Sequence, residues 1–189
     1  WHTNSGKKLK ITFERFLSMA VHNLGCQKIT FEPLNFSGEV EILSGLDFTV
    51  HAPWWKDSNW DCLRKEKHEN IFAVLGKTRR SELYLYSSFR LDGENITNCQ
   101  TVEDERFLGT QFRLKLIEGQ TSSYTKMSVN YAGKKGMTDP EFIWSKGMEL
   151  AQKYKEASYE KEFEKHVSYW DNVWSNLDIV IEGDPENQQ

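Results

Sequence analysis

The sequence has few cysteines and no long apolar run, and both features narrow its class. Cys26, Cys62 and Cys99 are odd in number and form no C-x-x-C pair. This favours free structural thiols in a reducing compartment over disulfides or a zinc site. No apolar stretch approaches the ~20 residues that cross a bilayer, so no membrane span is expected. The formal net charge is only −4, with both signs mixed, so nucleic acid is not an expected partner.

No signal peptide precedes the first strand-like run, and the chain begins at Trp1 rather than at Met. We therefore expect a cytoplasmic protein whose two ends are cut from something longer. In that compartment the sequons Asn35-Phe36-Ser37 and Asn95-Ile96-Thr97 are chance matches.

Common catalytic motifs are also missing. G-x-S-x-G, G-x-G-x-x-G and G-x-x-x-x-G-K do not occur, and the five histidines lack H-x-x-x-H or H-E-x-x-H spacing. The candidate carboxylate groups are Asp57 with Asp61, four positions apart in an expected loop, and the cluster Glu103-Asp104-Glu105, but such groups are common on solvated surfaces. His166, in the last helical segment, is expected to be packed or solvated. The sequence predicts no catalytic residue, no metal site and no cofactor in this chain.

Aromatic residues are abundant: seven Trp, seven Tyr and eleven Phe make 13% of the chain, which suits a β-rich domain. A hydrophobic period of two runs from Lys7 to about Asn130. Asp92-Gly93 and Glu118-Gly119 are predicted to be hairpin-type connections. Six to nine strands without a helix between them predict an antiparallel sandwich. The predicted strand segments are 9–13, 29–31, 40–42, 71–75, 83–91, 107–117 and 122–130.

The hydrophobic period changes to 3.6 at Thr138. Thr138-Asp139-Pro140-Glu141 combines an N-cap, a proline at the first helical position and a capping glutamate. Helices are predicted at 139–155 and 159–176, and the tryptophans of the second one need a partner surface. The predicted apolar stripes are Ile143, Met148, Leu150 and Ala151 on the first helix, and Phe163, Val167, Trp170, Val173, Trp174 and Leu177 on the second.

Residues 52–69 are predicted to form a long loop that carries Trp54, Trp55 and Trp60. Flat indole faces stack on sugar rings, so these three residues are the candidate substrate-binding residues. The alternative is that they pack against the sandwich, the helices or a second subunit, because interfaces also enrich tryptophan. Charged residues in the same segment, among them Lys56, Asp57, Arg64 and Lys65, make full burial of the loop unlikely in either case.

Four segments of the sequence are informative because of the order in which they follow one another along the chain. Phe13-Glu14-Arg15-Phe16-Leu17-Ser18-Met19-Ala20 comes first, followed by segments 31–47 and 72–77. The last segment is an aromatic helix followed by Ile179-Val180-Ile181-Glu182-Gly183-Asp184 and then Gln188-Gln189. Together they resemble the inverting disaccharide phosphorylases, which include the maltose, trehalose, nigerose and kojibiose phosphorylases. Glu14 departs from that family, which has a basic residue there.

The resemblance implies a mainly β fold: an antiparallel, galactose-mutarotase-like super-β-sandwich that lacks its first strands, followed by two linker helices. It places the sandwich at 1–134, the helical linker at 135–178 and the start of a missing (α/α)6 catalytic barrel at 179–189. In such enzymes an acid in the barrel protonates the leaving oxygen while inorganic phosphate, a co-substrate, attacks with inversion and releases β-glucose 1-phosphate. This chain would then be non-catalytic. Its expected partners are the missing barrel, a second copy in a homodimer and, in the parent enzyme, the disaccharide.

Two alternatives remain open. The first is a free-standing carbohydrate-binding sandwich, supported by the three tryptophans. The second is the same domain of a related α-glucoside hydrolase, such as a trehalase-like enzyme. Sugar binding by the isolated chain would distinguish the first alternative from a phosphorylase domain. The second alternative differs from a phosphorylase domain only at the phosphate site, which lies outside this chain.

Overall fold

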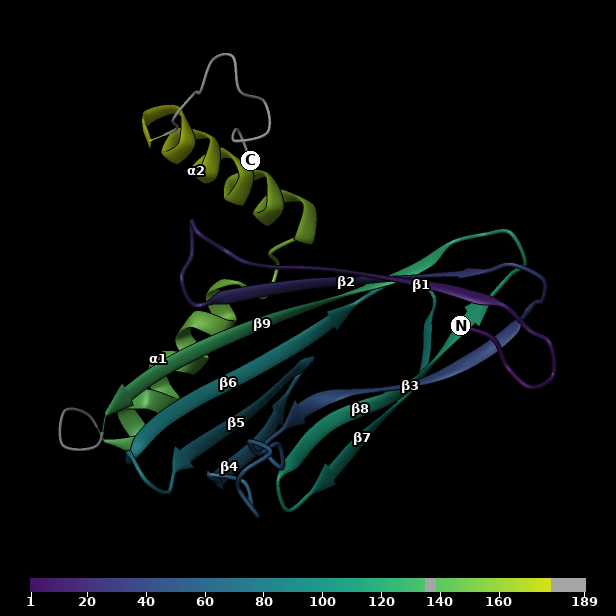
Figure 1. Cartoon of the computed structure of the whole chain (residues 1–189). Helices are drawn as coiled ribbons and strands as arrows, with labels where there is room; N and C mark the ends of the chain where they lie inside the picture. Colours follow the sequence, from purple (N-terminus) through teal and green to yellow (C-terminus); the bar gives the residue numbers. More distant parts are fainter. Residues whose placement is uncertain (135–138, 178–189) are drawn as a thin grey trace.

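The structure is a computed structural model that describes residues 1–134 and 139–177. These residues form nine strands followed by two helices (Figure 1). No helix within the described ranges is long and apolar enough to span a membrane. The elements are β1 (Leu9–Leu17), β2 (Leu24–Pro33), β3 (Gly38–Asp47), β4 (Trp60–His68), β5 (Ile71–Thr78), β6 (Leu83–Asp92), β7 (Ile96–Asp104), β8 (Phe107–Leu116), β9 (Ser122–Lys134), α1 (Pro140–Lys153) and α2 (Tyr159–Leu177).

The strands form two antiparallel sheets. A six-stranded sheet has the order β1-β2-β9-β6-β5-β4, and a three-stranded sheet has the order β3-β8-β7. The three-stranded sheet packs on one face of the large sheet, and α1 covers the other (Figure 1). The predicted antiparallel sandwich with two following helices is therefore confirmed. The division at 134/135 stays a prediction, and residues 179–189 lie outside the described residues.

The predicted hairpin connections are wrong. Asp92-Gly93 joins β6 to β7, and Glu118-Gly119 joins β8 to β9, so each carries the chain from one sheet to the other. Turn-forming residues mark where the chain reverses, but they do not say whether the next strand pairs with the previous one. Position 119 favours glycine because its φ is +72°, a left-handed conformation that residues with a Cβ seldom adopt.

Two strands, β4 and β7, were not predicted. Residues 60–68 of the expected loop are in fact β4, and both β4 and β7 lie at a sheet edge. Edge strands carry charged and polar residues that discourage pairing with other chains, and this composition hides the period of two. β4 contains Arg64-Lys65-Glu66-Lys67, and β7 contains Thr97-Asn98-Cys99-Gln100 together with a bulge.

The sandwich core lies between the two sheets in two clusters. Side chains from β1, β2, β8 and β9 make the first, and side chains from β5, β6, β8 and the segment after β3 make the second. Alternate residues of β8 point inward and are almost completely buried, which sets the register of the small sheet against the large one. The buried members are Leu9, Ile29, Phe31, Phe112, Leu114, Leu116 and Tyr124 in the first cluster, and Phe48, Phe72, Val74, Phe89 and Leu108 in the second.

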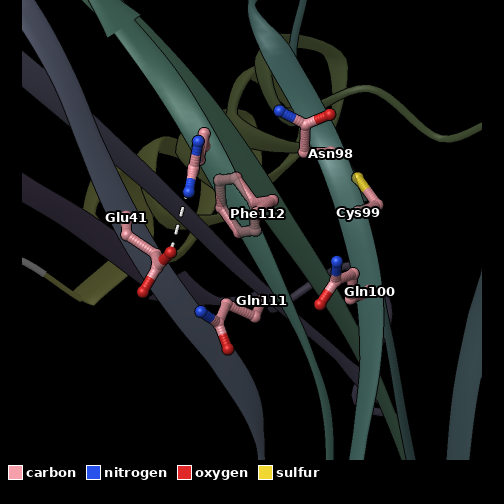
Figure 2. A pocket seen from close by; sticks show the side chains of 7 residues that line it. Glu41, Asn98, Cys99, Gln100, Gln111 and Phe112 are labelled. Atoms are coloured by element: carbon pink, nitrogen blue, oxygen red, sulfur yellow. Dashed lines mark ion pairs between the residues drawn. The ribbon is translucent and has the colours of Figure 1, made fainter.

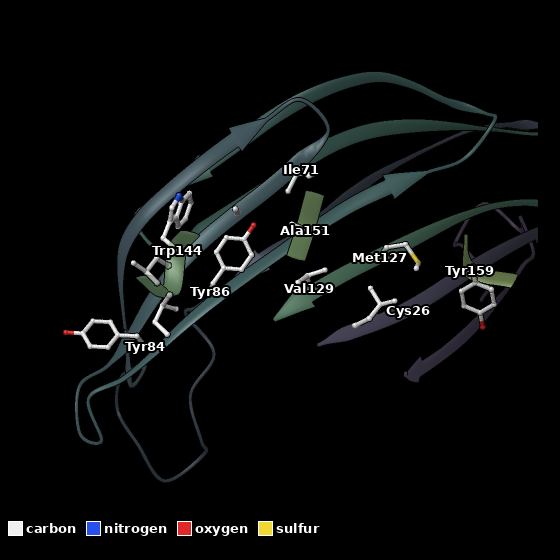
Figure 3. Close-up of a cluster of buried hydrophobic side chains, with 13 residues drawn as sticks. Cys26, Ile71, Tyr84, Tyr86, Met127, Val129, Trp144, Ala151 and Tyr159 are labelled. Carbon is white, nitrogen blue, oxygen red and sulfur yellow. The ribbon is translucent and has the colours of Figure 1, made fainter. Parts of the chain in front are cut away.

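A third cluster packs α1 against the other face of the six-stranded sheet (Figure 3). Asp139 caps the helix by accepting a hydrogen bond from the Phe142 backbone N–H at 2.6 Å, and Pro140 is its first residue, as predicted. Thr138 lies outside the described residues. Ile143 and Ala151 are buried as expected, whereas Met148 and Leu150 are only half-buried. Trp144 and Gly147 complete the contact face, which sits directly on Tyr86.

Only the first part of α2 rests on the sheet. Phe16 of β1 contacts the rings of Tyr159, Phe163 and His166, with centroids 4.9–5.5 Å apart. His166 accepts a hydrogen bond from the Met19 N–H at 3.3 Å, so it is packed, as expected. The second half of the helix extends away from the sandwich (Figure 1).

Candidate functional site

The three candidate tryptophans lie in three different environments. Trp54 is 79% exposed in the segment between β3 and β4. Trp55 is half-buried, and its ring carries the Arg80 guanidinium 4.2 Å from its centroid. Trp60 begins β4 and packs edge-to-face on Phe48, with ring centroids 5.4 Å apart, at the margin of the sandwich core. Only Trp54 therefore presents an open indole face, so the three do not form a common stacking platform.

Ion pairs fix the segment that carries Trp54 and Trp55. Arg79 donates to Asp57 at 2.7 Å and to Asp61 at 2.8 Å, and Arg106 donates to the other oxygen of Asp57 at 2.7 Å. Ser58 is buried and donates its hydroxyl to the Phe48 carbonyl. The loop is thus tied to the β5–β6 and β7–β8 turns. These partners are far from Asp57 in sequence, so no local pattern could have predicted them.

Electrostatics exclude Asp57 as a general acid. The hydrogen bonds from Arg106, Arg79 and the Ser58 N–H hold its pKa well below the usual range. A glycosidic acid needs the opposite shift, because it must hold a proton near neutral pH. Asp61 shares Arg79, so both carboxylates of the candidate pair are ion-paired anchors.

The acidic run at the β7–β8 turn is likewise engaged in surface contacts. Glu103 pairs with Lys65 at 3.0 Å, and Glu105 lies 3.8 Å from Arg106. Within residues 1–134 and 139–177, no three His, Cys, Asp or Glu side chains are placed to hold a metal ion. Cys26, Cys62 and Cys99 are all free thiols, and burial raises the pKa of Cys26 to about 12, so it is an inert core thiol.

A polar depression of about 490 Å³ lies on the outer face of the three-stranded sheet (Figure 2). The amides of Asn98, Gln100 and Gln111 line it, and Figure 2 shows the ion pair that Glu41 makes with Arg113 at its rim. It offers no aromatic face, since Phe112 points into the core and is fully buried. Its cation is already neutralised, so we assign it no ligand.

The apolar stripe of α2 is partly exposed. Trp174 is 56% exposed and Leu177 is 69% exposed, while Trp170 stacks on Trp174 with centroids 6.0 Å apart. Soluble proteins seldom leave adjacent large apolar side chains open unless the surface binds something. The predicted need of this helix for a partner surface is thus met only in part by β1 and β2.

These features define a class: an antiparallel sandwich domain with a helical extension and an exposed aromatic surface on its last helix. The chain belongs to the family described as glycosyl hydrolase family 65, N-terminal domain, which matches residues 1–173.

Relatives agree with this assignment. The chain is 25% identical to a kojibiose phosphorylase of Halothermothrix orenii over 97% of its own length and 25% of that protein. It is 27% identical to an alpha,alpha-trehalose phosphorylase of Geobacillus stearothermophilus over 100% of its own length and 25% of the relative. The chain thus spans about a quarter of the length of the curated relatives that it matches.

The fold is also found in a solved structure described as "Putative kojibiose phosphorylase from human microbiome". The TM-score is 0.88 at 21% sequence identity, and the alignment covers 100% of this chain and 24% of the other.

Proposed function

We propose that this chain is the non-catalytic N-terminal domain of a glycoside phosphorylase. The parent enzyme would cleave an α-linked glucose disaccharide with inorganic phosphate and release β-glucose 1-phosphate with inversion. The observation that carries the proposal is the match of nearly the whole chain to one quarter of kojibiose and trehalose phosphorylases. The absence of a carboxyl group suited to acid catalysis at the Asp57 site agrees with a catalytic centre elsewhere. The free thiols support a cytoplasmic location for the enzyme.

The role of the domain in that enzyme is to pack on the catalytic barrel or on a second copy. The exposed half of α2 is the surface suited to this, since its tryptophans recover hydrophobic free energy only when covered. Each indole contributes roughly 1.5–3 kcal/mol on full burial, so two stacked ones form a strong anchor.

Direct sugar contact is a second candidate role, and it depends on Trp54. An indole that is 79% exposed on a segment fixed by two arginines is already ordered for stacking. Trp55 and Trp60 are engaged with Arg80 and Phe48 and would contribute little area to a sugar.

The test compares this 189-residue chain with the full reading frame that contains it. Both are incubated with kojibiose, nigerose, trehalose or maltose, with and without phosphate. We expect β-glucose 1-phosphate from the full protein only, with the anomer identified by NMR. Phosphate-independent release of glucose would identify a hydrolase instead, and turnover by the 189-residue chain would overturn the non-catalytic role. Titration of the chain with the same sugars, with Trp54→Ala as the variant, tests the second candidate role.

A further inference from the structure

A cavity of about 510 Å³ lies against β1, β2 and β9, beside the edge of the three-stranded sheet. It opens on the face of the large sheet that bears the sandwich core, because Lys126 reaches across to the Gly45 carbonyl of β3. Its lining is more apolar than polar in area but includes two basic side chains and several neutral polar ones, and Gly25 leaves its floor without a side chain. The lining includes Arg15, Leu17, Gln27, Lys126, Ser128 and Asn130.

Strand register brings two cations to this cavity. Arg15 of β1 lies opposite Gln27 of β2, and Gln27 lies opposite Lys126 of β9. Residues directly opposite in antiparallel strands have Cβ atoms about 5 Å apart and share a face. The guanidinium and the ammonium therefore flank one amide on the same side of the sheet.

Among residues 1–134 and 139–177, neither cation has an acidic partner. No carboxylate lines the cavity, and in the part of the chain that the structure describes neither Arg15 nor Lys126 forms an ion pair. Other arginines of the same chain, such as Arg79 and Arg113, each bind two carboxylates. The cavity is therefore a place where positive charge is left uncompensated.

Lys126 is held in place and poorly solvated. Its Nζ donates to the Gly45 carbonyl at 2.8 Å and lies 4.4 Å from the centroid of the Phe89 ring. Burial lowers its pKa to about 8, which reflects the cost of keeping this ammonium charged. An ammonium has three donor hydrogens, and the carbonyl uses one. An anion in the cavity would take the others and offset the desolvation cost.

Neutral hydrogen-bond donors also line the cavity, beside the two cations. The amide of Gln27 and the hydroxyl of Ser128 lie at the same cavity, and the amide oxygen of Asn130 already accepts from Ser87 at 2.7 Å, which leaves its NH2 to donate. Leu17, 76% exposed, supplies an apolar wall. Two cations with several neutral donors suit a dianion that also carries hydroxyl groups, and the volume falls in the usual range for small-molecule sites.

We propose that this cavity is a binding site for a phosphate group, carried by a hydroxylated small molecule such as a hexose phosphate or present as inorganic phosphate, with Arg15 and Lys126 as its charged ligands. The site is separate from the phosphate site of the proposed reaction, because it uses residues of this chain alone. It therefore stands or fails independently of the proposed function.

The test is a titration of the 189-residue chain, labelled with nitrogen-15, with glucose 1-phosphate, inorganic phosphate and glucose, followed by amide NMR and calorimetry. We expect saturable 1:1 binding of the phosphorylated sugar, with shifts centred on Gln27, Lys126 and Ser128, and no binding of glucose. Equal affinity for inorganic phosphate would identify the free ion as the ligand, whereas tighter binding of glucose 1-phosphate would identify the sugar phosphate.

Matched variants assign the site. Arg15→Gln, on an exposed position, and Lys126→Met should each weaken binding at least tenfold, and Lys126→Arg should retain most of it. Arg113→Gln is the control, since it removes one positive charge from the other sheet and should leave the affinity within twofold. Binding that Arg15→Gln and Arg113→Gln weaken equally would reduce the effect to net charge and overturn the proposal. No saturable binding of either anion, or shifts confined to other residues, would overturn it as well.

Discussion

Gly147→Ala is the substitution for which the structure and ordinary helix propensity predict opposite results. Within a helix, replacing glycine by alanine normally stabilises by about 1 kcal/mol. Here an added Cβ would lie 2.1 Å from Cγ and 2.2 Å from Cδ1 of Tyr86. Tyr86 is fully buried and cannot withdraw, because Trp144 packs edge-to-face on its ring with centroids 5.4 Å apart.

Relief of that contact requires α1 to move off the sheet, and this loosens Ile143 and Ala151 as well. Overpacking of a core typically costs 1–3 kcal/mol, and moving a whole helix places this case at the upper end. After the gain in helix propensity is subtracted, we expect a net loss of about 2 kcal/mol in the free energy of unfolding.

The measurement is urea denaturation of the 189-residue chain, followed by tryptophan fluorescence and far-UV circular dichroism. Ser145→Ala is the control, because position 145 is exposed on the same helix and the change should be neutral or slightly stabilising. Tyr86→Gly also removes the Tyr86 Cβ, which would lie 2.6 Å from the added Cβ, and it should be strongly destabilising alone. In the double variant Gly147→Ala should then cost nothing further, which gives a coupling energy of about 2 kcal/mol. A Gly147→Ala protein as stable as the parent, or additive effects in the cycle, would refute the packing of α1 described above.

Three further predictions concern charge and exposed surface. The pKa of Lys126 is lowered from 10.5 to about 8, so between these pH values the unfolded chain binds a proton that the folded chain does not. The free energy of unfolding should therefore rise with pH across that window, by up to about 3 kcal/mol. In Lys126→Met this rise should be smaller when unfolding is measured at pH 7.5 and 10. The chain should self-associate at micromolar concentration in analytical ultracentrifugation, and Trp174→Ser should weaken the association, whereas a monomer at all concentrations would argue against α2 as a packing surface. Asp57→Asn removes the charge that Arg79 and Arg106 share and should increase proteolysis between residues 49 and 59, and unchanged cleavage would show that the loop is held without that ion pair.

Sequence reasoning identified the central strands and both helices because burial imposes a hydrophobic period on them. β5 and β6 are buried on both faces of the large sheet, and α1 begins at a cap and proline that define it locally. β4 and β7 could not be recognised from the sequence, because both are edge strands. Their charged and polar residues discourage pairing with other chains, and these residues hide the alternation of apolar and polar positions. Phe13 shows the same limit: the alternation around it was recognised, but it is 64% exposed because β1 is an edge strand beyond the cover of the small sheet.

The candidate site could be predicted only as far as residue type, because its geometry is long-range. Trp54, Trp55 and Trp60 are neighbours in sequence, yet their surroundings differ. Trp54 is exposed to solvent, Trp55 stacks on Arg80, and Trp60 packs on Phe48. The cation pair of Arg15 and Lys126 is the converse case: 111 positions separate the two residues, and only the order β1-β2-β9 brings them to one face. A strand order that places the last strand beside the second therefore creates surfaces that local patterns do not contain. The proposed phosphate site accordingly lies on β1, β2 and β9, and not in the loop whose tryptophans are conspicuous in the sequence.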